Sequence, residues 1–112
     1  MDAAEKNRLY EEEAGQYCDG IIDEMEHVRF TQKMGGYKDE EVDAFLDKMV
    51  NLLHYHKTGK SKKVFLEPAA LQAYVFHEGQ MGYNMEQVDA YVEKLMDMLA
   101  GINEIKSRYL VD

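Results

Sequence analysis

Cysteine and proline are scarce in this chain of 112 residues, and each scarcity limits the folds and the cell compartments that we expect for the protein. The one cysteine, Cys18, has no partner for a disulfide within the chain. The one proline, Pro68, leaves long stretches free to form helix, which the many Leu, Met, Glu, Lys and Ala residues favour. No apolar run approaches the ~20 residues of a membrane span, and no pattern of a secretion signal is present. We therefore expect a cytoplasmic, mostly helical protein.

Basic residues are few as well. The chain has 13 Lys and Arg residues against 22 Asp and Glu residues, a net charge of -9. This charge repels phosphate backbones and anionic lipid surfaces, so we expect no nucleic-acid partner. One segment departs from the trend: the Lys-rich linker at 57–63 contains Lys57, Lys60, Lys62 and Lys63. Such charge runs usually keep a linker solvated, and contact with lipid or with an acidic partner is the alternative.

The spacing of apolar residues predicts four helices. The first follows a stripe from Tyr10 to Val28 and ends before the glycines at 35–36, and the second covers 39–56. A short third helix begins at Pro68, and the fourth carries the apolar residues of 88–105. No segment alternates polar and apolar residues for long enough to predict a strand. We therefore predict an all-α fold of about four helices.

One phrase occurs twice in the chain. "GGYKDEEVDAF" at 35–45 is followed 46 positions later by "MGYNMEQVDAY" at 81–91, and a phenylalanine precedes each copy, at Phe30 and Phe76. Neither copy contains a nucleophile with a base or a cluster of metal ligands, so the phrase predicts a shape rather than a reaction. We define the repeated helix-start motif as Gly36, Tyr37, Val42 and Asp43 in the first copy and Gly82, Tyr83, Val88 and Asp89 in the second.

The second copy of the motif has the features of a helix N-terminus. Asn84 can cap the helix by accepting from the backbone N–H of Gln87, whose side chain can reach back to Asn84 in a capping box. Tyr83 and Val88 then occupy the positions of a hydrophobic staple. The first copy has no capping side chain, and its acidic first turn compensates. The glycine of each copy predicts a turn with positive φ just before its helix.

Two segments together carry a resemblance to a known family: "LEPAALQAYVFHEGQMGYNMEQVDAYVEKL" (66–95) and "FTQKMGGYKDEEVDAFLDKM" (30–49). They share a Phe, a loop that ends in Gly-Tyr, and a helix that begins with Glu-x-Val-Asp. This pattern resembles the N-terminal segment of DivIVA-like bacterial cell-division and polarity proteins. The two copies, at one fixed offset, cover somewhat over half of the chain.

The resemblance implies a fold and a function. In that family the segment forms a parallel dimer in which short helices and crossed loops cap a coiled coil, exposed loop tips touch membrane, and the proteins are non-enzymatic scaffolds. The corresponding loop tips here are Met34 and Gly35 in the first copy and Gln80 and Met81 in the second. We therefore expect an adaptor in bacterial cell division or polar growth that binds protein partners. The alternative is a peripheral membrane-binding module that uses these tips at the inner face of the membrane, at septum or poles.

The duplication allows two kinds of pairing. We predict a single domain, 1–112, with repeats at about 20–57 and 66–109 joined by the Lys-rich linker. Within one chain the seams 42–53 and 88–99 can pack in parallel, as a bundle or short coiled coil, and make a pseudo-dimer. Exchange of repeats between two chains, which gives a domain-swapped homodimer, is the alternative.

Residue types that often carry chemistry do not form a reactive site in this pattern. Asp43 and Asp89 lack an accompanying base or phosphate loop, which favours a structural role at the helix N-terminus. His54 and His56 point ~200° apart on a helix and cannot share a metal ion. Cys18 lies on the apolar stripe of the first helix and is predicted to be a buried small hydrophobe. We therefore expect no enzymatic activity, no cofactor and no metal site.

Overall fold

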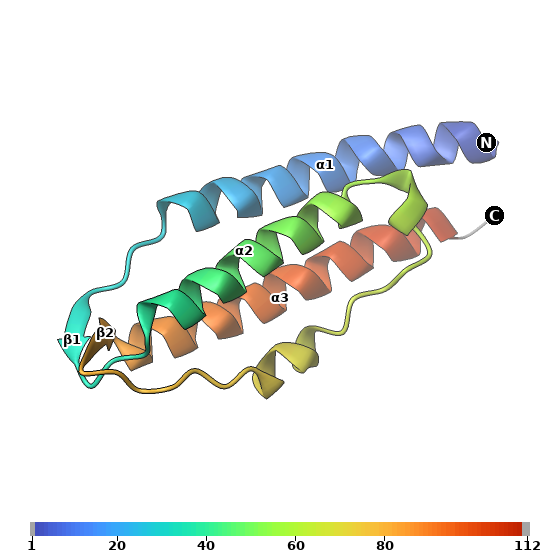
Figure 1. The fold of residues 1–112 in the computed structure, drawn as a ribbon. Coiled ribbons are helices and arrows are strands. Elements are labelled where there is room, and N and C mark those ends of the chain that lie inside the picture. Colours follow the sequence, from blue (N-terminus) through green and yellow to red (C-terminus); the bar gives the residue numbers. More distant parts are fainter. Residues whose placement is uncertain (1, 111–112) are drawn as a thin grey trace.

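The chain folds into an elongated, mostly helical molecule, 56 × 23 × 17 Å in extent. The computed structural model describes residues 2–110. In chain order its elements are α1 (Ala3–His27), β1 (Gln32–Met34), α2 (Asp39–His56), the 3-10 helices η1 (Gly59–Ser61) and η2 (Pro68–Ala73), β2 (Met81–Tyr83) and α3 (Met85–Leu110). α1 runs toward the small sheet, and α2 and α3 both start beside the sheet and run back toward the termini (Figure 1). α2 and α3 are thus parallel to each other and antiparallel to α1.

The helix ends follow the local chemistry of the sequence. Asp2 caps α1 by accepting from the Glu5 N–H at 2.8 Å, and Asn84 accepts from the Gln87 N–H at 3.1 Å at the start of α3. Lys38, before α2, gives no side-chain cap, and the acidic first turn of α2 stabilises that end instead. The predicted second helix and the Asn84 cap are confirmed. The predicted third helix is a 3-10 helix.

None of the described helices is both long enough and apolar enough to span a membrane.

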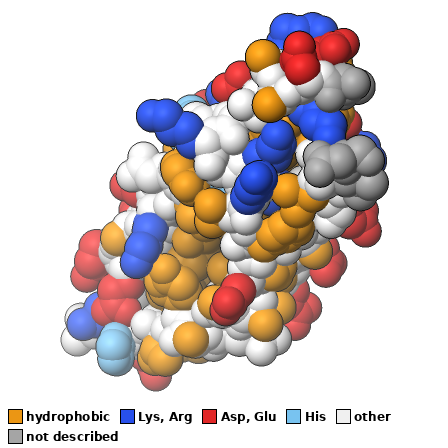
Figure 2. Space-filling model, turned by 90° about the vertical axis from the view of Figure 1, so that its right-hand side faces the viewer, with side chains coloured by type: hydrophobic (Ala, Val, Ile, Leu, Met, Phe, Trp, Pro, Cys, Tyr) orange, Lys and Arg blue, Asp and Glu red, His pale blue; other side chains and the backbone are white. Residues whose placement is uncertain are grey.

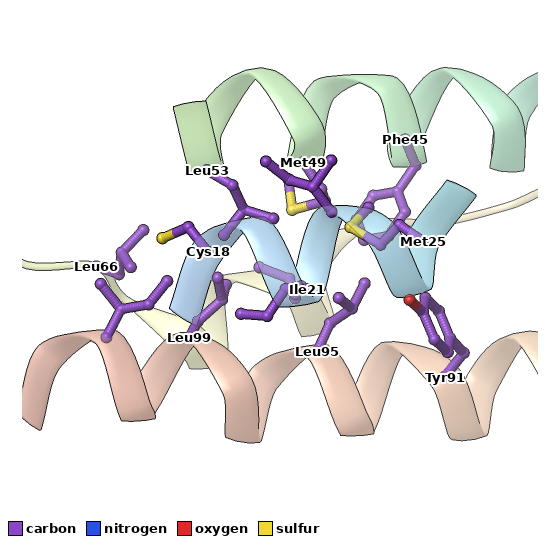
Figure 3. Close-up of a cluster of buried hydrophobic side chains, with 13 residues drawn as sticks. Cys18, Ile21, Met25, Phe45, Met49, Leu53, Leu66, Tyr91, Leu95 and Leu99 are labelled. Carbon is purple, nitrogen blue, oxygen red and sulfur yellow. The ribbon is translucent and has the colours of Figure 1, made fainter. Parts of the chain in front are cut away.

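One hydrophobic core joins the three α-helices. Side chains of α2 and α3 point toward α1 from either side, so α1 closes the space between them (Figure 3). The buried members of this core are Cys18, Ile21, Ile22, Met25, Phe45, Met49, Leu53, Leu66, Leu71, Tyr91, Leu95, Leu99 and Ile102. Burial raises the pKa of the Cys18 thiol to about 11. The prediction that Cys18 is a buried small hydrophobe is confirmed.

A two-stranded antiparallel sheet lies at the end of the molecule opposite the termini (Figure 1). β1 and β2 pair in the register Gln32↔Tyr83, Lys33↔Gly82 and Met34↔Met81. The prediction of an all-α fold is therefore wrong in this detail, although the fold is mostly helical. Each strand has three residues, too few for an alternation to be visible in the sequence, and its partner strand lies in the other repeat.

A buried polar cluster lies near the other end of the molecule. Lys106, on α3, is fully buried, and its Nζ donates to Tyr10 Oη at 2.8 Å, to the Ser61 carbonyl at 2.7 Å and to Ser61 Oγ at 3.2 Å. These acceptors match the three N–H bonds of the ammonium, and burial lowers the pKa of Lys106 to about 8. Lys57 forms an ion pair with Asp19 on α1 at 2.6 Å. The Lys-rich linker, expected to be solvated, is thus held against α1 and α3.

His56 belongs to the same buried cluster. Its side chain is 2% exposed, and its Nδ1 has no hydrogen-bond partner among the described residues. Its backbone carbonyl accepts from the Tyr10 hydroxyl at 2.8 Å. Burial, and then the charge of Lys106, lowers the pKa of His56 to about 4. The imidazole is therefore neutral in the folded protein at neutral pH.

Acid is expected to destabilise the fold through His56. Below pH 6.5 the unfolded chain takes up a proton that folded His56 does not take up until about pH 4, so stability falls as the pH drops through this window. We expect roughly 3 kcal/mol of unfolding free energy to be lost there. Urea denaturation at a series of pH values measures this loss. His56→Leu should flatten the dependence and His54→Leu, at an exposed site, should not; equal slopes in both variants would rule out this mechanism.

Candidate functional site

The loops that lead into α2 and α3 cross, and the crossing is reciprocal. The Tyr37 N–H donates to the Tyr83 carbonyl at 2.9 Å, and the Tyr83 N–H donates to the Tyr37 carbonyl, also at 2.9 Å. The two tyrosines occupy equivalent positions of the helix-start motif, 46 residues apart. Each repeat therefore meets the other at the same point of its own sequence.

The glycines of the motif permit this close approach. A Cβ atom on Gly82 would lie 2.0 Å from the Tyr37 carbonyl oxygen, and one on Gly36 would lie 2.5 Å from the Tyr83 carbonyl oxygen. The prediction of positive φ at both glycines is wrong: among the described residues only Gly35 has a positive φ, of 75°. Gly36 and Gly82 are needed because the other loop occupies the space where a side chain would begin.

Two side chains in the first turns of α2 and α3 hold the crossed loops. Gln87 Oε1 accepts from the Thr31 backbone N–H at 2.8 Å, and at the equivalent place Glu41 Oε1 accepts from the His77 backbone N–H at 2.7 Å. This second hydrogen bond is the main cause of the lowered pKa of Glu41. The expected bond from the Gln87 side chain back to the Asn84 N–H is wrong, because that N–H donates to the Thr31 carbonyl at 2.8 Å.

Each tyrosine of the motif reaches the aspartate of the other copy. Tyr37 Oη donates to Asp89 Oδ1 at 2.8 Å, and Tyr83 Oη donates to Asp43 Oδ1 at 2.8 Å. Burial, followed by the hydrogen bond to the carboxylate, raises the pKa of both phenols, that of Tyr83 to about 12. The two aspartates are thus acceptors in contacts between the repeats, a role that sequence reasoning placed within each helix.

Two clefts lie on either side of this crossing. The first acidic cleft, of about 490 Å³, is lined by Met25, Glu26, Val28, Arg29, Phe30, Asp43, Leu46, Asp47, Val50 and Tyr83. The second acidic cleft, of about 350 Å³, is lined by Tyr37, Leu71, Gln72, Tyr74, Val75, Phe76, Asp89, Val92, Glu93 and Met96. Both combine apolar walls with carboxylates from one helix and a tyrosine from the other repeat.

The two clefts are built from equivalent residues. All ten positions of the first have a counterpart in the second at an offset of 46 residues. The carboxylates that the clefts share are Asp43 and Asp47 in the first and Asp89 and Glu93 in the second, in each case four residues apart on an exposed helix face. The duplication of the sequence has therefore produced two copies of one surface feature.

Two substitutions change the charge of the lining between the clefts: Glu26 of the first cleft corresponds to Gln72 of the second, and Arg29 to Val75. Arg29 lines the first cleft, where its Nη1 donates to the carbonyls of Glu26 at 3.1 Å and Val28 at 2.8 Å. Val75 occupies the equivalent position in the second cleft. The first cleft therefore has an additional carboxylate and a cation, which offset each other, so the two linings have the same formal charge.

The chemistry of these clefts suits binding of a cationic side chain. The lining of each cleft has no nucleophile paired with a base, and each tyrosine hydroxyl already donates to a carboxylate. Within the described part of the chain, no group of three or more His, Cys, Asp and Glu side chains is placed to hold a metal ion. Two carboxylates one turn apart beside an apolar wall can accept the charged end of a Lys or Arg side chain.

The loop tips named from the sequence come together at the sheet. Met34 and Met81 face each other in the register of β1 and β2 and are 81% and 57% exposed, and the Gly35 N–H donates to the Gln80 carbonyl at 3.0 Å. The Lys-rich linker lies at the opposite end of the molecule, where η1 connects to α2 (Figure 1). The tips and the linker therefore belong to separate surfaces.

Sequence reasoning missed the second carboxylate of each cleft. Asp47 and Glu93 are equivalent at the offset of 46 residues and lie four residues after the motif aspartates, so extending the comparison would have found the pair. Acidic residues on exposed helix faces are common, however, and nothing local marks these two. The tyrosine that completes each cleft comes from the other repeat, and that proximity is visible only in the fold.

Gly82→Ala tests the close crossing. The added methyl group would meet the Tyr37 carbonyl and force the loops apart, so we expect a loss of unfolding free energy of about 1 to 3 kcal/mol or more. Gly20→Ala is the matched control, since a Cβ there meets no atom within 4 Å and alanine favours the helix, by up to about 1 kcal/mol. Urea denaturation measures both. A Gly82→Ala protein as stable as the wild type would contradict the proximity of the loops.

Comparisons with known proteins add no assignment to this geometry. No protein-family model, no curated protein and no solved structure matches the chain. The resemblance to DivIVA-like proteins thus depends on the repeated phrase and the residues around it.

Proposed function

We propose that the chain is a non-enzymatic, DivIVA-like interaction module that acts as an adaptor by binding protein partners. In this proposal the two repeats pair within the chain as a pseudo-dimer. The reciprocal hydrogen bonds between Tyr37 and Tyr83 and the parallel course of α2 and α3 support this pairing, because a two-fold arrangement makes every contact twice. A homodimer with exchanged repeats would make the same contacts between chains and is the alternative pairing.

The acidic clefts are the partner sites in this proposal. The observation that carries it is the agreement of all ten lining positions between two clefts at one sequence offset. A basic side chain of a partner would place its charged end on the carboxylates and its aliphatic stem on the apolar wall. Arginine suits the site better than lysine, since its planar guanidinium can engage both carboxylates at once. The net charge of -9 would also speed the approach of a basic segment.

The setting of this adaptor follows from the family resemblance. We propose a role in bacterial cell division or polar growth, in the cytoplasm and at septum or poles. Two equivalent clefts on one chain could engage two basic segments, which raises the avidity for a partner that carries such a segment twice or is itself a dimer. That property suits a scaffold.

A titration with a basic peptide tests the clefts. The probe is a short capped peptide with arginines between leucines, added to isotope-labelled protein and followed by NMR chemical shifts. We expect shifts at residues of both clefts, and an affinity about tenfold lower in Asp47→Asn or Glu93→Gln, the loss of one charge-assisted hydrogen bond. Because the formal charges of the two linings are equal, the two variants should have similar effects.

Matched controls separate recognition from general attraction. The same peptide with citrulline in place of arginine keeps the shape and loses the charge, and should bind weakly. Asp97→Asn removes an exposed carboxylate of α3 outside the clefts and should leave the affinity unchanged. If Asp97→Asn weakened peptide binding as much as the cleft variants, or if chemical shifts changed over the whole surface, net charge would explain the binding. Either result would contradict the proposal.

The loop tips favour a second candidate function, peripheral membrane binding. Two exposed methionines lie side by side at one end of the molecule, and Lys33 is adjacent to one of them in β1. Burial of one methionine in lipid contributes ~1.5 to 3 kcal/mol, so both are needed for measurable binding against the repulsion of anionic lipid. In this alternative the crossed loops would touch the inner face of the membrane.

Flotation with small anionic vesicles tests this second function. If the tips dock, the wild type should float with the vesicles at low salt, and the double variant Met34→Asp/Met81→Asp should stay with the free protein. Val75→Asp is the control, since Val75 is 74% exposed and lies outside the tips. No flotation of the wild type at low or physiological salt would exclude membrane docking by this chain alone.

A further inference from the structure

An apolar groove next to the second acidic cleft has no occupant from this chain. It has a volume of about 610 Å³ and lies between α2 and the segment 64–74, with Leu52, Tyr55, Val64, Phe65 and Tyr74 among its lining residues. Tyr55, Val64 and Phe65 are each 42% to 44% exposed. Figure 2 looks onto the end of the molecule with the termini and shows apolar side chains gathered in the middle of that face, with basic side chains beside them. We name this feature the α2 groove.

The equivalent surface of α3 shows what such a groove accepts. α1 covers this flank of α3: Tyr17 Oη donates to the Met98 carbonyl at 3.1 Å, and the Tyr17 ring fits over Gly101, where a Cβ would lie 2.2 Å from Tyr17 Oη. Glu24 of α1 forms an ion pair with Lys94 of α3. The occupant of the α3 flank is therefore an amphipathic helix whose carboxylate meets a lysine.

The same positions on α2 are left open. At the offset of 46 residues, Lys48, Leu52 and Tyr55 of α2 correspond to Lys94, Met98 and Gly101 of α3, and all three line the α2 groove. The chain supplies only the six-residue η2 and the extended residues 64–66 on this side, where α1 supplies 25 residues on the other. The second repeat thus lacks the long helix that would cover this flank.

Charge distinguishes the rim of the α2 groove from the rest of the molecule. Lys48 is exposed, and among the described residues it has no carboxylate partner, its Nζ lying 5.5 Å from the centre of the Tyr74 ring. Lys62 and Lys63 directly precede the wall residue Val64 in the chain. The lining itself contains one lysine, Lys48, and one carboxylate, Glu67, so the basic part of the rim is at Lys48 and beside Val64.

We propose that the α2 groove binds an acidic amphipathic helix of a protein partner. The apolar face of that helix packs on Leu52, Val64 and Phe65, and a carboxylate on its flank pairs with Lys48, as Glu24 of α1 pairs with Lys94. The wall formed by 48–56 is about 12 Å long at 1.5 Å per residue, which accommodates two to three helical turns. This site shares Leu71 and Tyr74 with the second acidic cleft, but its contacts at Lys48, Leu52 and Phe65 are its own and do not depend on the function proposed for the clefts.

An NMR titration of the full chain with a helix derived from α1 tests this proposal. The probe is a synthetic peptide of residues 8–27 with Tyr17→Ala, because Tyr55 stands where Gly101 makes room for the Tyr17 ring. We expect shifts at Leu52, Val64 and Phe65. Phe65→Ser should weaken binding about tenfold or more, as loss of an aromatic anchor does.

Charge reversal tests the pairing with Lys48. Lys48→Glu should weaken binding several-fold, and a second peptide that also carries Glu24→Lys should restore it to the Lys48→Glu protein. Lys33→Glu, at the sheet end, is the matched control and should have no effect. Circular dichroism spectra and thermal melts of the variants check that the fold is retained, as expected from the exposure of Lys48 and Phe65.

Four results would overturn the proposal. Absence of shifts in the groove is one, and shifts confined to Met98 and Gly101, which mean that the peptide has replaced α1, are another. Concentration-dependent dimerisation that Phe65→Ser abolishes would identify a second copy of the chain as the occupant. Shifts in the groove with dodecanoate but not with the peptide would identify a small anionic amphiphile instead.

Discussion

The crossing of two loops at Tyr37 and Tyr83 is the constraint on which the rest of the structure depends. Two backbone hydrogen bonds join these residues, and Gly36 and Gly82 let the chains come close enough to form them. Because α2 and α3 start directly after the crossing, it sets them on parallel courses and leaves the space between them to α1. The same crossing carries each tyrosine to the aspartate of the other copy, which creates the two acidic clefts.

Away from the crossing the two repeats diverge, and the divergence determines which surfaces are free. The first repeat is preceded by a helix of 25 residues that covers the flank of α3, whereas the second has a six-residue 3-10 helix and leaves the flank of α2 open. The linker between the repeats is fastened by the buried ammonium of Lys106, whose hydrogen bonds offset the cost of its burial. The proposed partner contacts consequently have opposite charge, the carboxylates of the clefts and Lys48 of the α2 groove.

Local patterns predicted the helices more reliably than the contacts between them. The helix at 39–56, the cap at Asn84 and the burial of Cys18 all depend on residues within a few positions of one another, and the structure agrees with each. The strands and the bond made by Gln87 were wrong or missed, because their partners lie in the other repeat. For the candidate site, the sequence identified the motif residues but did not predict that they assemble into clefts.

The sequence by itself determined the helix at 39–56, the cap of α3 at Asn84 and the equivalence of the two repeats, since periodicity, capping and a constant offset can be read along the chain. Only the tertiary structure decided that the Tyr83 hydroxyl donates to Asp43 and the Tyr37 hydroxyl to Asp89. The same is true of buried Lys106, which donates to the Ser61 carbonyl. The physical reason is that a hydrogen bond between distant segments leaves no trace in the residues next to either partner. A repeat shows which residues are equivalent, and the fold alone decides which of them meet.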